Sequence, residues 1–337
     1  MTKRKKEDIE LKRPPILFKD TQTVINQILT KVDGDFMSYW GSGNSRISMN
    51  DVVAFYEMLK HKEHHKRLYL FIKSGGGNGQ TSLRIINLLR EYYDEIVALV
   101  PLECASAATM LVLGADRIEM GSLAYLSAVD TSITHDLSPV DVDNDLVSVS
   151  QVELSRVLKL WEDRKQEGDA NPYNSLYGHI HPLVFGAVDR ASSLSMKLTT
   201  EILSYHMSDL SKAESISQHL NSAYPAHGYP ITFREAQKVG LDVIKMDADV
   251  NELLLTLNNL YSEMAQLSIT DYDEFNYHDN EILKLIETNL VKLFYQKDKD
   301  MHYRSEERKW VSMNDMSSWR KITETEDGYA ESKFYIN

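Results

Sequence analysis

The segment from residue 67 to residue 120 alternates between short apolar runs and amphipathic helical patterns. Its apolar runs are "RLYLFIKS" (67–74), "EIVALV" (95–100) and "RIEM" (117–120), and a helical pattern follows each of the first two. A strand–helix–strand–helix–strand order predicts a mostly parallel sheet with right-handed crossovers. We therefore expect an α/β fold whose functional loops gather at the carboxyl ends of the strands.

A glycine run, "SGGG" (74–77), follows the first of these strands. Glycine tolerates backbone conformations that other residues avoid, and such a loop can leave its N–H groups free to bind a ligand. The run lacks the Gly-Lys-Ser/Thr of a phosphate-binding loop and the spacing of a dinucleotide fingerprint, so no nucleotide cofactor is expected. Either a tight turn or an oxyanion hole explains it.

A serine among small residues, "CASAATM" (104–110), follows the second strand and precedes an apolar helical run. Ser106 is either the N-cap of a tightly packed helix or a nucleophile. In the second case, the N–H of Ala107 would lie beside the reacting oxygen. A glycine loop and a serine at the same edge of a sheet make a minimal acyl-transfer site. Cys104 is a weaker candidate nucleophile, because a small buried cysteine is more common than a reactive one.

Three segments, "FIKSGGG", "ASAATMLVLGADRI" and "HGYPITFREAQKVGLDVI", resemble the Clp/crotonase superfamily, which includes Clp-type peptidases and signal peptide peptidase A. The nearest resemblance is to the serine dehydrogenase proteinase family. That family's small-Ser-small, "PVDP"-like and "HxYPI" motifs correspond here to "ASA" (105–107), "AVDT" (128–131) and "HGYPI" (227–231). The resemblance covers residues 33–246. It implies a Clp/crotonase-like domain over 33–248 and an ATP-independent serine endopeptidase that needs no metal or other cofactor.

The resemblance also implies a set of catalytic residues. Ser106 would be the nucleophile, Asp130 the orienting acid and His227 the general base. A triad is defined by geometry and role rather than by order along the chain. The implied oxyanion hole consists of the backbone N–H groups of Gly76, Gly77 and Ala107.

Several alternatives stay open. Signal peptide peptidase A uses a Ser–Lys dyad, for which Lys159 and Lys197 are the candidate bases, and His135 or His219 could replace His227. The sequence also departs from the family pattern: alanines replace the glycines around the serine, and the prolines of "PVDP" are missing. These departures fit a specialised subfamily or a site that has lost activity, as in a catalytically inactive interaction protein. A crotonase-like enzyme acting on thioesters is a further alternative, which the small-Ser-small patch disfavours.

The composition limits the classes of partner that this chain can bind and the compartment in which it is expected. The net charge of −13 argues against general nucleic-acid binding, which needs a basic surface. No run approaches the roughly 20 apolar residues of a membrane span. The single cysteine excludes an intrachain disulfide and, together with the lack of a signal peptide, favours a cytoplasmic location. We expect a peptide or protein substrate and, from the resemblance, a homo-oligomer.

The sequence predicts different secondary structure for the two ends of the chain. Residues 1–32 are polar and contain Pro14 and Pro15, which predicts an arm without helix. Residues 249–337 are expected to form a helical extension, with helical patterns at 249–267 and 280–297 and no assignment beyond them.

Overall fold

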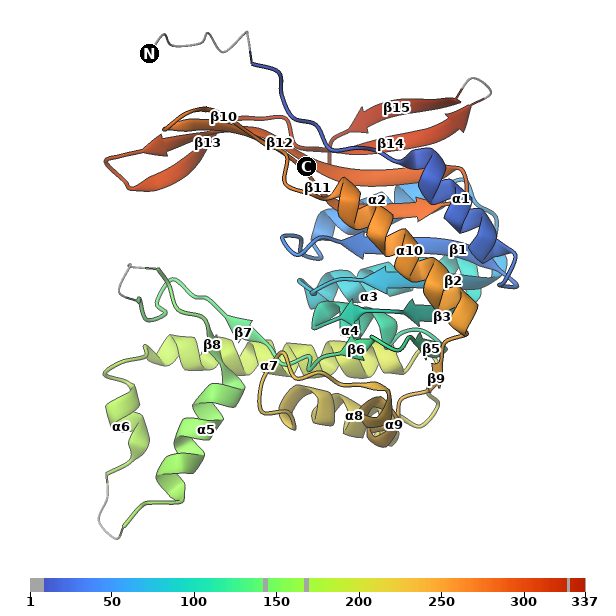
Figure 1. The fold of residues 1–337 in the computed structure, drawn as a ribbon. Coiled ribbons are helices and arrows are strands. Elements are labelled where there is room, and N and C mark those ends of the chain that lie inside the picture. Colours follow the sequence, from blue (N-terminus) through green and yellow to red (C-terminus); the bar gives the residue numbers. More distant parts are fainter. Residues whose placement is uncertain (1–8, 142–144, 167–169, 326–327, 337) are drawn as a thin grey trace.

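The computed structural model describes residues 9–141, 145–166, 170–325 and 328–336 (Figure 1). An eleven-stranded mixed sheet runs through the molecule, with the main order β15-β14-β12-β11-β1-β2-β3-β5-β9. Its parallel half consists of β1 (Asp35–Gly41), β2 (His65–Lys73), β3 (Tyr93–Val100), β5 (Arg117–Met120) and β9 (Val243–Lys245). The expectation of a parallel βαβ sheet is confirmed.

Helices connect the parallel strands and cover one face of the sheet. The connections contain α2 (Met49–Leu59), α3 (Gly79–Tyr92) and α4 (Ala107–Val112). On β2, Leu68, Leu70 and Ile72 pack into the core under these helices, whereas Tyr69 and Phe71 pack into a second core on the other face. Both faces of β2 are buried, which explains its continuous apolar sequence.

The C-terminal region corrects the expectation of a helical extension. Its described residues form one helix, α10 (Ala248–Met264), followed by antiparallel strands that extend the same sheet through pairing of β11 with β1. These strands are β10 (Ile269–Asp273), β11 (Asn276–Thr288), β12 (Val291–Arg304), β13 (Lys309–Asp315), β14 (Ser318–Thr325) and β15 (Gly328–Phe334).

The helix predicted at 280–297 is therefore wrong, and burial explains the error. Most of β11 is buried on both faces, so its sequence does not alternate between apolar and polar residues. Its fully buried Ile282, Leu285 and Ile286 instead fall at helix-like spacing. The turn to β12 contains only Asn289 and Leu290, and Leu290 adopts a φ of 69° without the glycine that would have marked a hairpin.

The N-terminal arm also differs from expectation. Residues 18–29 form α1 (Phe18–Leu29), whose Phe18, Ile25 and Ile28 are buried. The helix starts just after the two prolines, and it packs with α10 on the face opposite α3.

Although β4 (Glu103–Cys104) lies next to the carboxyl end of β2, most of the remaining elements lie beyond β5 in Figure 1. The helices α7 and α8 run along this side of the sheet, and α5, α6, β7 and β8 project away from it. The bounds are β4 (Glu103–Cys104), β6 (Tyr125–Leu126), β7 (Ser132–Ile133), β8 (Val149–Ser150), α5 (Gln151–Glu162), α6 (Pro172–Leu176), α7 (Pro182–Leu203), α8 (Leu210–Ser222) and α9 (Phe233–Val239).

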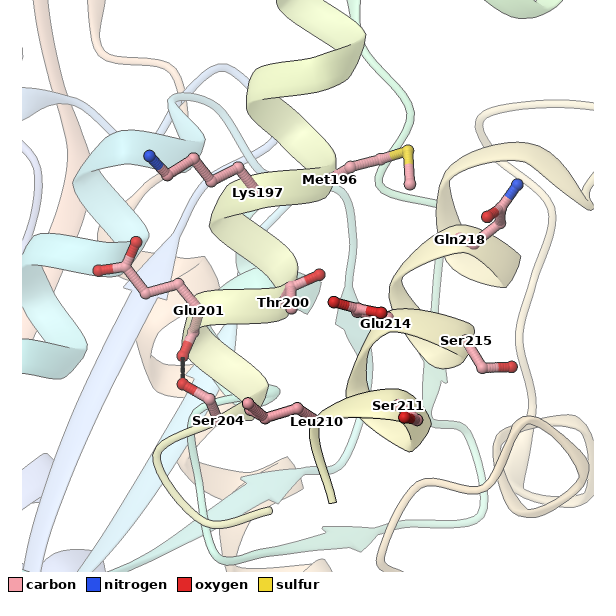
Figure 2. Close-up of a pocket in the computed structure, with 10 residues that line it drawn as sticks. All are labelled: Met196, Lys197, Thr200, Glu201, Ser204, Leu210, Ser211, Glu214, Ser215 and Gln218. Carbon is pink, nitrogen blue, oxygen red and sulfur yellow. Dashed lines mark hydrogen bonds between the residues drawn. The ribbon is translucent and has the colours of Figure 1, made fainter. Parts of the chain in front are cut away.

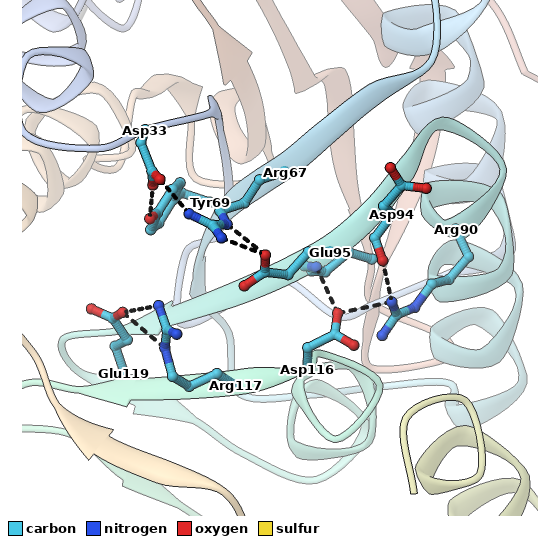
Figure 3. Close-up of polar contacts among 10 residues, drawn as sticks. Asp33, Arg67, Tyr69, Arg90, Asp94, Glu95, Asp116, Arg117 and Glu119 are labelled. Carbon is cyan, nitrogen blue, oxygen red and sulfur yellow. Dashed lines mark hydrogen bonds and ion pairs between the residues drawn. The ribbon is translucent and has the colours of Figure 1, made fainter. Parts of the chain in front are cut away.

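Charged contacts connect the strands near their amino ends (Figure 3). Arg67 at the start of β2 pairs with Glu95 of β3, and Arg90 of α3 pairs with Asp116 ahead of β5. These contacts lie away from the carboxyl ends of the strands. They therefore connect neighbouring parts of the sheet and are separate from the glycine loop and the Ser106 turn. Within the described ranges, no helix is long and apolar enough to span a membrane.

Candidate active site

Ser106 lies in a strained turn between β4 and α4. Its φ of 54° and ψ of −120° fit the second position of a type II′ turn, which glycine favours. The turn is closed by a 2.9 Å hydrogen bond from the Ala108 N–H to the Ala105 carbonyl. A serine in such a conformation costs on the order of 1–3 kcal/mol. The Ser106 hydroxyl hydrogen-bonds to nothing in the described part of the chain, so it does not act as the helix cap that the sequence allowed.

Buried hydroxyl groups hold this turn in place. The Ser106 N–H donates to the Ser127 hydroxyl at 2.8 Å, and the Ser127 N–H donates to the Thr109 hydroxyl at 3.1 Å. Thr109 in turn donates to the Cys104 carbonyl, and Ser82 donates to the Ala107 carbonyl. These residues could not be identified from the sequence, because a hydroxyl that bonds to a distant backbone atom leaves no spacing pattern.

The glycine loop lies directly against the serine turn. Gly76 has a φ of 99°, and a Cβ on it would come within 2.6 Å of the Ala105 carbonyl oxygen and 2.7 Å of the Ser106 Cβ. The Ala105 N–H also donates to the Ser74 carbonyl at 2.9 Å. Only glycine fits at position 76, because both the backbone angle and the close approach exclude a side chain.

The three expected oxyanion donors differ in their hydrogen bonding. The Gly76 N–H is already engaged, since it donates to the Ser74 hydroxyl at 3.1 Å. The N–H groups of Gly77 and Ala107 have no partner among the residues that the structure describes. One free donor, the N–H of Ala107, therefore lies inside the turn of Ser106, and the other, the N–H of Gly77, lies in the glycine loop against it.

Asp130 and His227 form a hydrogen-bonded pair. The His227 Nδ1 lies 2.9 Å from the Asp130 Oδ1, and this contact raises the pKa of His227 above its ordinary value. The carboxylate is 14% exposed and the imidazole 49% exposed. Asp130 follows Val129, which is fixed by the Ser195 hydroxyl and by its N–H bond to Leu220. The histidine lies in the loop between α8 and α9.

One cavity of about 440 Å³ brings these groups together. Ser106, Asp130 and His227 all line it. Gly77 and Ala107, whose N–H groups are free, line it as well. No hydrogen bond between Ser106 and His227 occurs within the described ranges. The other lining residues are Arg46, Gly75, Asn78, Gly79, Gln80, Met110, Val129, Thr131, Ser132, Ala191, Leu194, Ser195 and Leu198.

The two candidate lysines lie elsewhere. Lys159, exposed on α5, lines an adjoining cavity of about 450 Å³ that shares Asp130 and Thr131 with the first. Lys197 lines a cavity between α7 and α8, and in Figure 2 it points to the side of α7 away from α8. Neither lysine lines the cavity that contains Ser106.

The other candidates, Cys104, His135 and His219, do not line the cavity that contains Ser106 either. Cys104 is buried, and burial raises the pKa of its thiol well above the ordinary value, which disfavours a reactive thiolate. The His135 ring accepts a bond from the Leu137 N–H, and the His219 ring packs edge-on against Tyr224. Among the described residues, no group of three His, Cys, Asp or Glu side chains could hold a metal ion.

Comparison with known proteins gives a distant relative. No protein-family model matches the chain. It is 24% identical over 217 residues to the uncharacterized protein MJ0137 of Methanocaldococcus jannaschii, an alignment that covers 64% of this chain. The match spans 66% of that protein, just under two thirds of its length.

Two solved structures show partial likeness. They are a serine-to-alanine mutant of the 1510-N membrane-bound stomatin-specific protease and a lysine-to-alanine mutant of it in complex with a substrate peptide. The first has a TM-score of 0.36 and 13% identity, covering 68% of this chain and 84% of that one. The second has a TM-score of 0.37 and 12% identity, covering 66% and 78%. With TM-scores this low, neither structure assigns an activity to this chain.

Proposed function

We propose that this chain is a serine peptidase of the Clp/crotonase type with Ser106, His227 and Asp130 as its catalytic residues. One observation carries the proposal: the hydrogen-bonded pair of His227 and Asp130 opens into the same cavity as the strained turn of Ser106. Strained backbone persists where function requires it, and a serine that caps nothing has no structural reason to hold such a turn.

The reaction begins with attack by the Ser106 Oγ on the carbonyl carbon of a peptide bond. His227 takes the hydroxyl proton at Nε2 as the C–O bond forms. The carbonyl oxygen becomes an oxyanion, which accepts hydrogen bonds from the N–H groups of Gly77 and Ala107. Collapse breaks the C–N bond, and His227 returns the proton to the departing amine. Water then hydrolyses the acyl-serine by the same steps, with His227 again as the base.

Asp130 determines which nitrogen of His227 is available. Its carboxylate accepts a hydrogen bond from the Nδ1–H, which holds the proton on Nδ1 and leaves Nε2 unprotonated and able to act as a base. The same contact favours the imidazolium that forms during attack, in agreement with the raised pKa of His227. The Ser106 hydroxyl must move within hydrogen-bond distance of Nε2 when substrate binds, as often happens in catalytic sites.

The main rival is a Ser–Lys dyad with Lys159, which lines the adjoining cavity. A lysine acts as a base only when burial lowers its pKa by several units, and Lys159 is exposed. We therefore prefer His227.

The proposal is tested by hydrolysis of a casein-like substrate. The Ser106→Ala variant should lose hydrolysis and keep its fold, whereas Ser122→Ala, a control on an exposed turn, should keep both. Undiminished hydrolysis by purified Ser106→Ala would exclude Ser106 as the nucleophile. A wild type that hydrolyses acyl thioesters and no peptide would favour the crotonase-like alternative, and one that hydrolyses neither would favour an interaction protein.

A further inference from the structure

Arg46 lines the cavity that contains Ser106, and the backbone on either side of it is held in place. It lies in the loop between β1 and α2, where Ser45 is anchored through its N–H and hydroxyl to the Ser42 carbonyl. Its neighbours Ser45 and Ile47 are 8% and 3% exposed, while Arg46 itself is exposed. The backbone here is held from both sides, and the arginine side chain is directed away from the core.

The segment that carries Arg46 is attached to the glycine loop. The Ile47 N–H donates to the Gly76 carbonyl at 2.8 Å, and the Ile47 carbonyl accepts from the Asn78 N–H at 2.9 Å. A Cβ on Gly77 would come within 2.4 Å of the Ile47 carbonyl oxygen, so the two segments are in close contact. Arg46 therefore stands next to the loop that supplies an oxyanion donor.

Arg46 also brings a positive charge that nothing in the described ranges neutralises. Three ionisable side chains line the cavity: Arg46, Asp130 and His227. Asp130 is engaged by His227, and no ion pair or hydrogen bond of the Arg46 side chain is found among the described residues. A guanidinium stays protonated at any relevant pH, and its planar fork fits a carboxylate with two parallel hydrogen bonds.

We infer that Arg46 binds a carboxylate of the peptide substrate and gives this site a preference for peptides with an acidic group close to the scissile bond. The inference rests on the proposed peptidase function. The carboxylate comes either from an aspartate or glutamate side chain or from a peptide C-terminus. The overall charge of −13 would repel acidic peptides elsewhere on the protein, so a local cation is what would attract them here.

The test uses two pairs of fluorogenic peptides and the full-length protein. One pair differs by Glu against Gln next to the scissile bond, and the other by a C-terminal carboxylate against an amide. The ratio of kcat/KM between acidic and neutral members is measured for the wild type and for Arg46→Gln, Arg46→Lys and Arg46→Glu. Arg84→Gln is the matched control, because Arg84 is exposed on α3 and does not line the cavity.

The wild type should prefer the acidic member of one pair by about tenfold to a hundredfold, as expected for a charge-assisted hydrogen bond. Arg46→Gln should abolish the preference, Arg46→Lys should keep part of it, and Arg46→Glu should reverse it. The control Arg84→Gln should keep the wild-type ratio. The peptide pair whose kcat/KM ratio depends on Arg46 shows whether the carboxylate belongs to a side chain or to the C-terminus. Equal ratios in wild type and Arg46→Gln would overturn the inference.

A peptide-binding measurement distinguishes an error in the carboxylate site from an error in the proposed peptidase function. If the wild type cleaves no peptide, fluorescence anisotropy with the same labelled peptides replaces kinetics. Tighter binding of an acidic peptide that is lost in Arg46→Gln but retained in Arg84→Gln would keep the carboxylate site while rejecting the peptidase. Equal binding of acidic and neutral peptides would reject both.

Discussion

The backbone N–H of Ser106 donates a hydrogen bond of 2.8 Å to the hydroxyl of Ser127, 21 positions further along the chain. The Ser127 hydroxyl also donates to the carbonyl of Ala128 at 2.9 Å, and Ser127 is 1% exposed. One buried side chain thus connects the turn of the proposed nucleophile with the segment that leads to Asp130. We therefore expect this contact to help fix the placement of Ser106 relative to Asp130.

Replacement of Ser127 by alanine should therefore affect both stability and turnover. The change leaves the Ser106 N–H without its partner, which costs about 1–3 kcal/mol of unfolding free energy. Loosening of the strained turn should also lower kcat more than it changes KM. Urea unfolding and steady-state kinetics measure the two effects, with Ser122→Ala as the exposed control. Wild-type kcat in the Ser127→Ala variant would show that this contact does not position the nucleophile.

The strain at Ser106 predicts an unusual stability order. Ser106→Gly relieves the positive φ, whereas Ser106→Ala removes the hydroxyl and keeps the strained backbone. We expect the glycine variant to be about 1 kcal/mol more stable than the alanine variant, and both to be inactive. Paired urea titrations measure the difference. A glycine variant less stable than the alanine variant would mean that the turn is not strained.

The parallel half of the fold is predictable from the sequence because its signals are local. Strands buried on both faces give continuous apolar runs, and the amphipathic helices between them show clear periodicity. The C-terminal strands are not predictable in this way. β11 pairs on both sides and is mostly buried on both faces, and its hairpin turn has no glycine, so its sequence resembles a helix. Which segments pair across the sheet is decided by tertiary packing.

The candidate site likewise has some residues that the sequence identifies and others that only the structure reveals. The motifs around Ser106, Asp130 and His227 were identified in the sequence, and the structure brings all three to one cavity. Their catalytic roles stay predictions. The supporting contacts of Ser127, Thr109 and Ser82 were not predicted, and neither was the position of Arg46. Each depends on distant segments meeting in space, which a spacing pattern does not encode.

The contact of His227 with Asp130 predicts the pH dependence of hydrolysis. The base must be unprotonated, so kcat/KM should rise with pH and reach half its maximum above the ordinary histidine pKa of about 6.5. The direction follows from the hydrogen bond to Asp130, which raises the pKa of His227. In Asp130→Asn the midpoint should fall and kcat should drop by about three to four orders of magnitude, because the tautomer is no longer held. A pH profile measured on both proteins tests this, and an unchanged midpoint would contradict it.

The same raised pKa has a consequence for stability. Protonated His227 is favoured in the folded state, so the contact contributes fully below the ordinary pKa and is lost as pH rises through the folded-state value. Because the ring is half-exposed, solvent screens the interaction and the contribution is small.

Glu287 on β11 is expected to secure α1 to the sheet. It accepts hydrogen bonds from Thr21 and Gln22 and pairs with Lys292 at 3.5 Å, with both charged side chains fully buried. Glu287→Leu would leave the Lys292 charge buried and unpaired, at a cost of about 3–5 kcal/mol. Thermal unfolding measures the loss. As a control, Glu252→Leu on the exposed surface of α10 should change stability little. Similar stability of the two variants would show that the buried pair is not needed.

The most direct test of the proposed chemistry is the rate at which a fluorophosphonate probe labels Ser106, with the site mapped by mass spectrometry. The probe reacts with a serine only when a base activates it. With His227 as the base, Ser106 should be labelled at similar rates in the wild type and in Lys159→Ala, and the rate should fall by orders of magnitude in His227→Ala. Unimpaired labelling in His227→Ala, together with its loss in Lys159→Ala, would contradict the triad and establish the Ser–Lys dyad in its place.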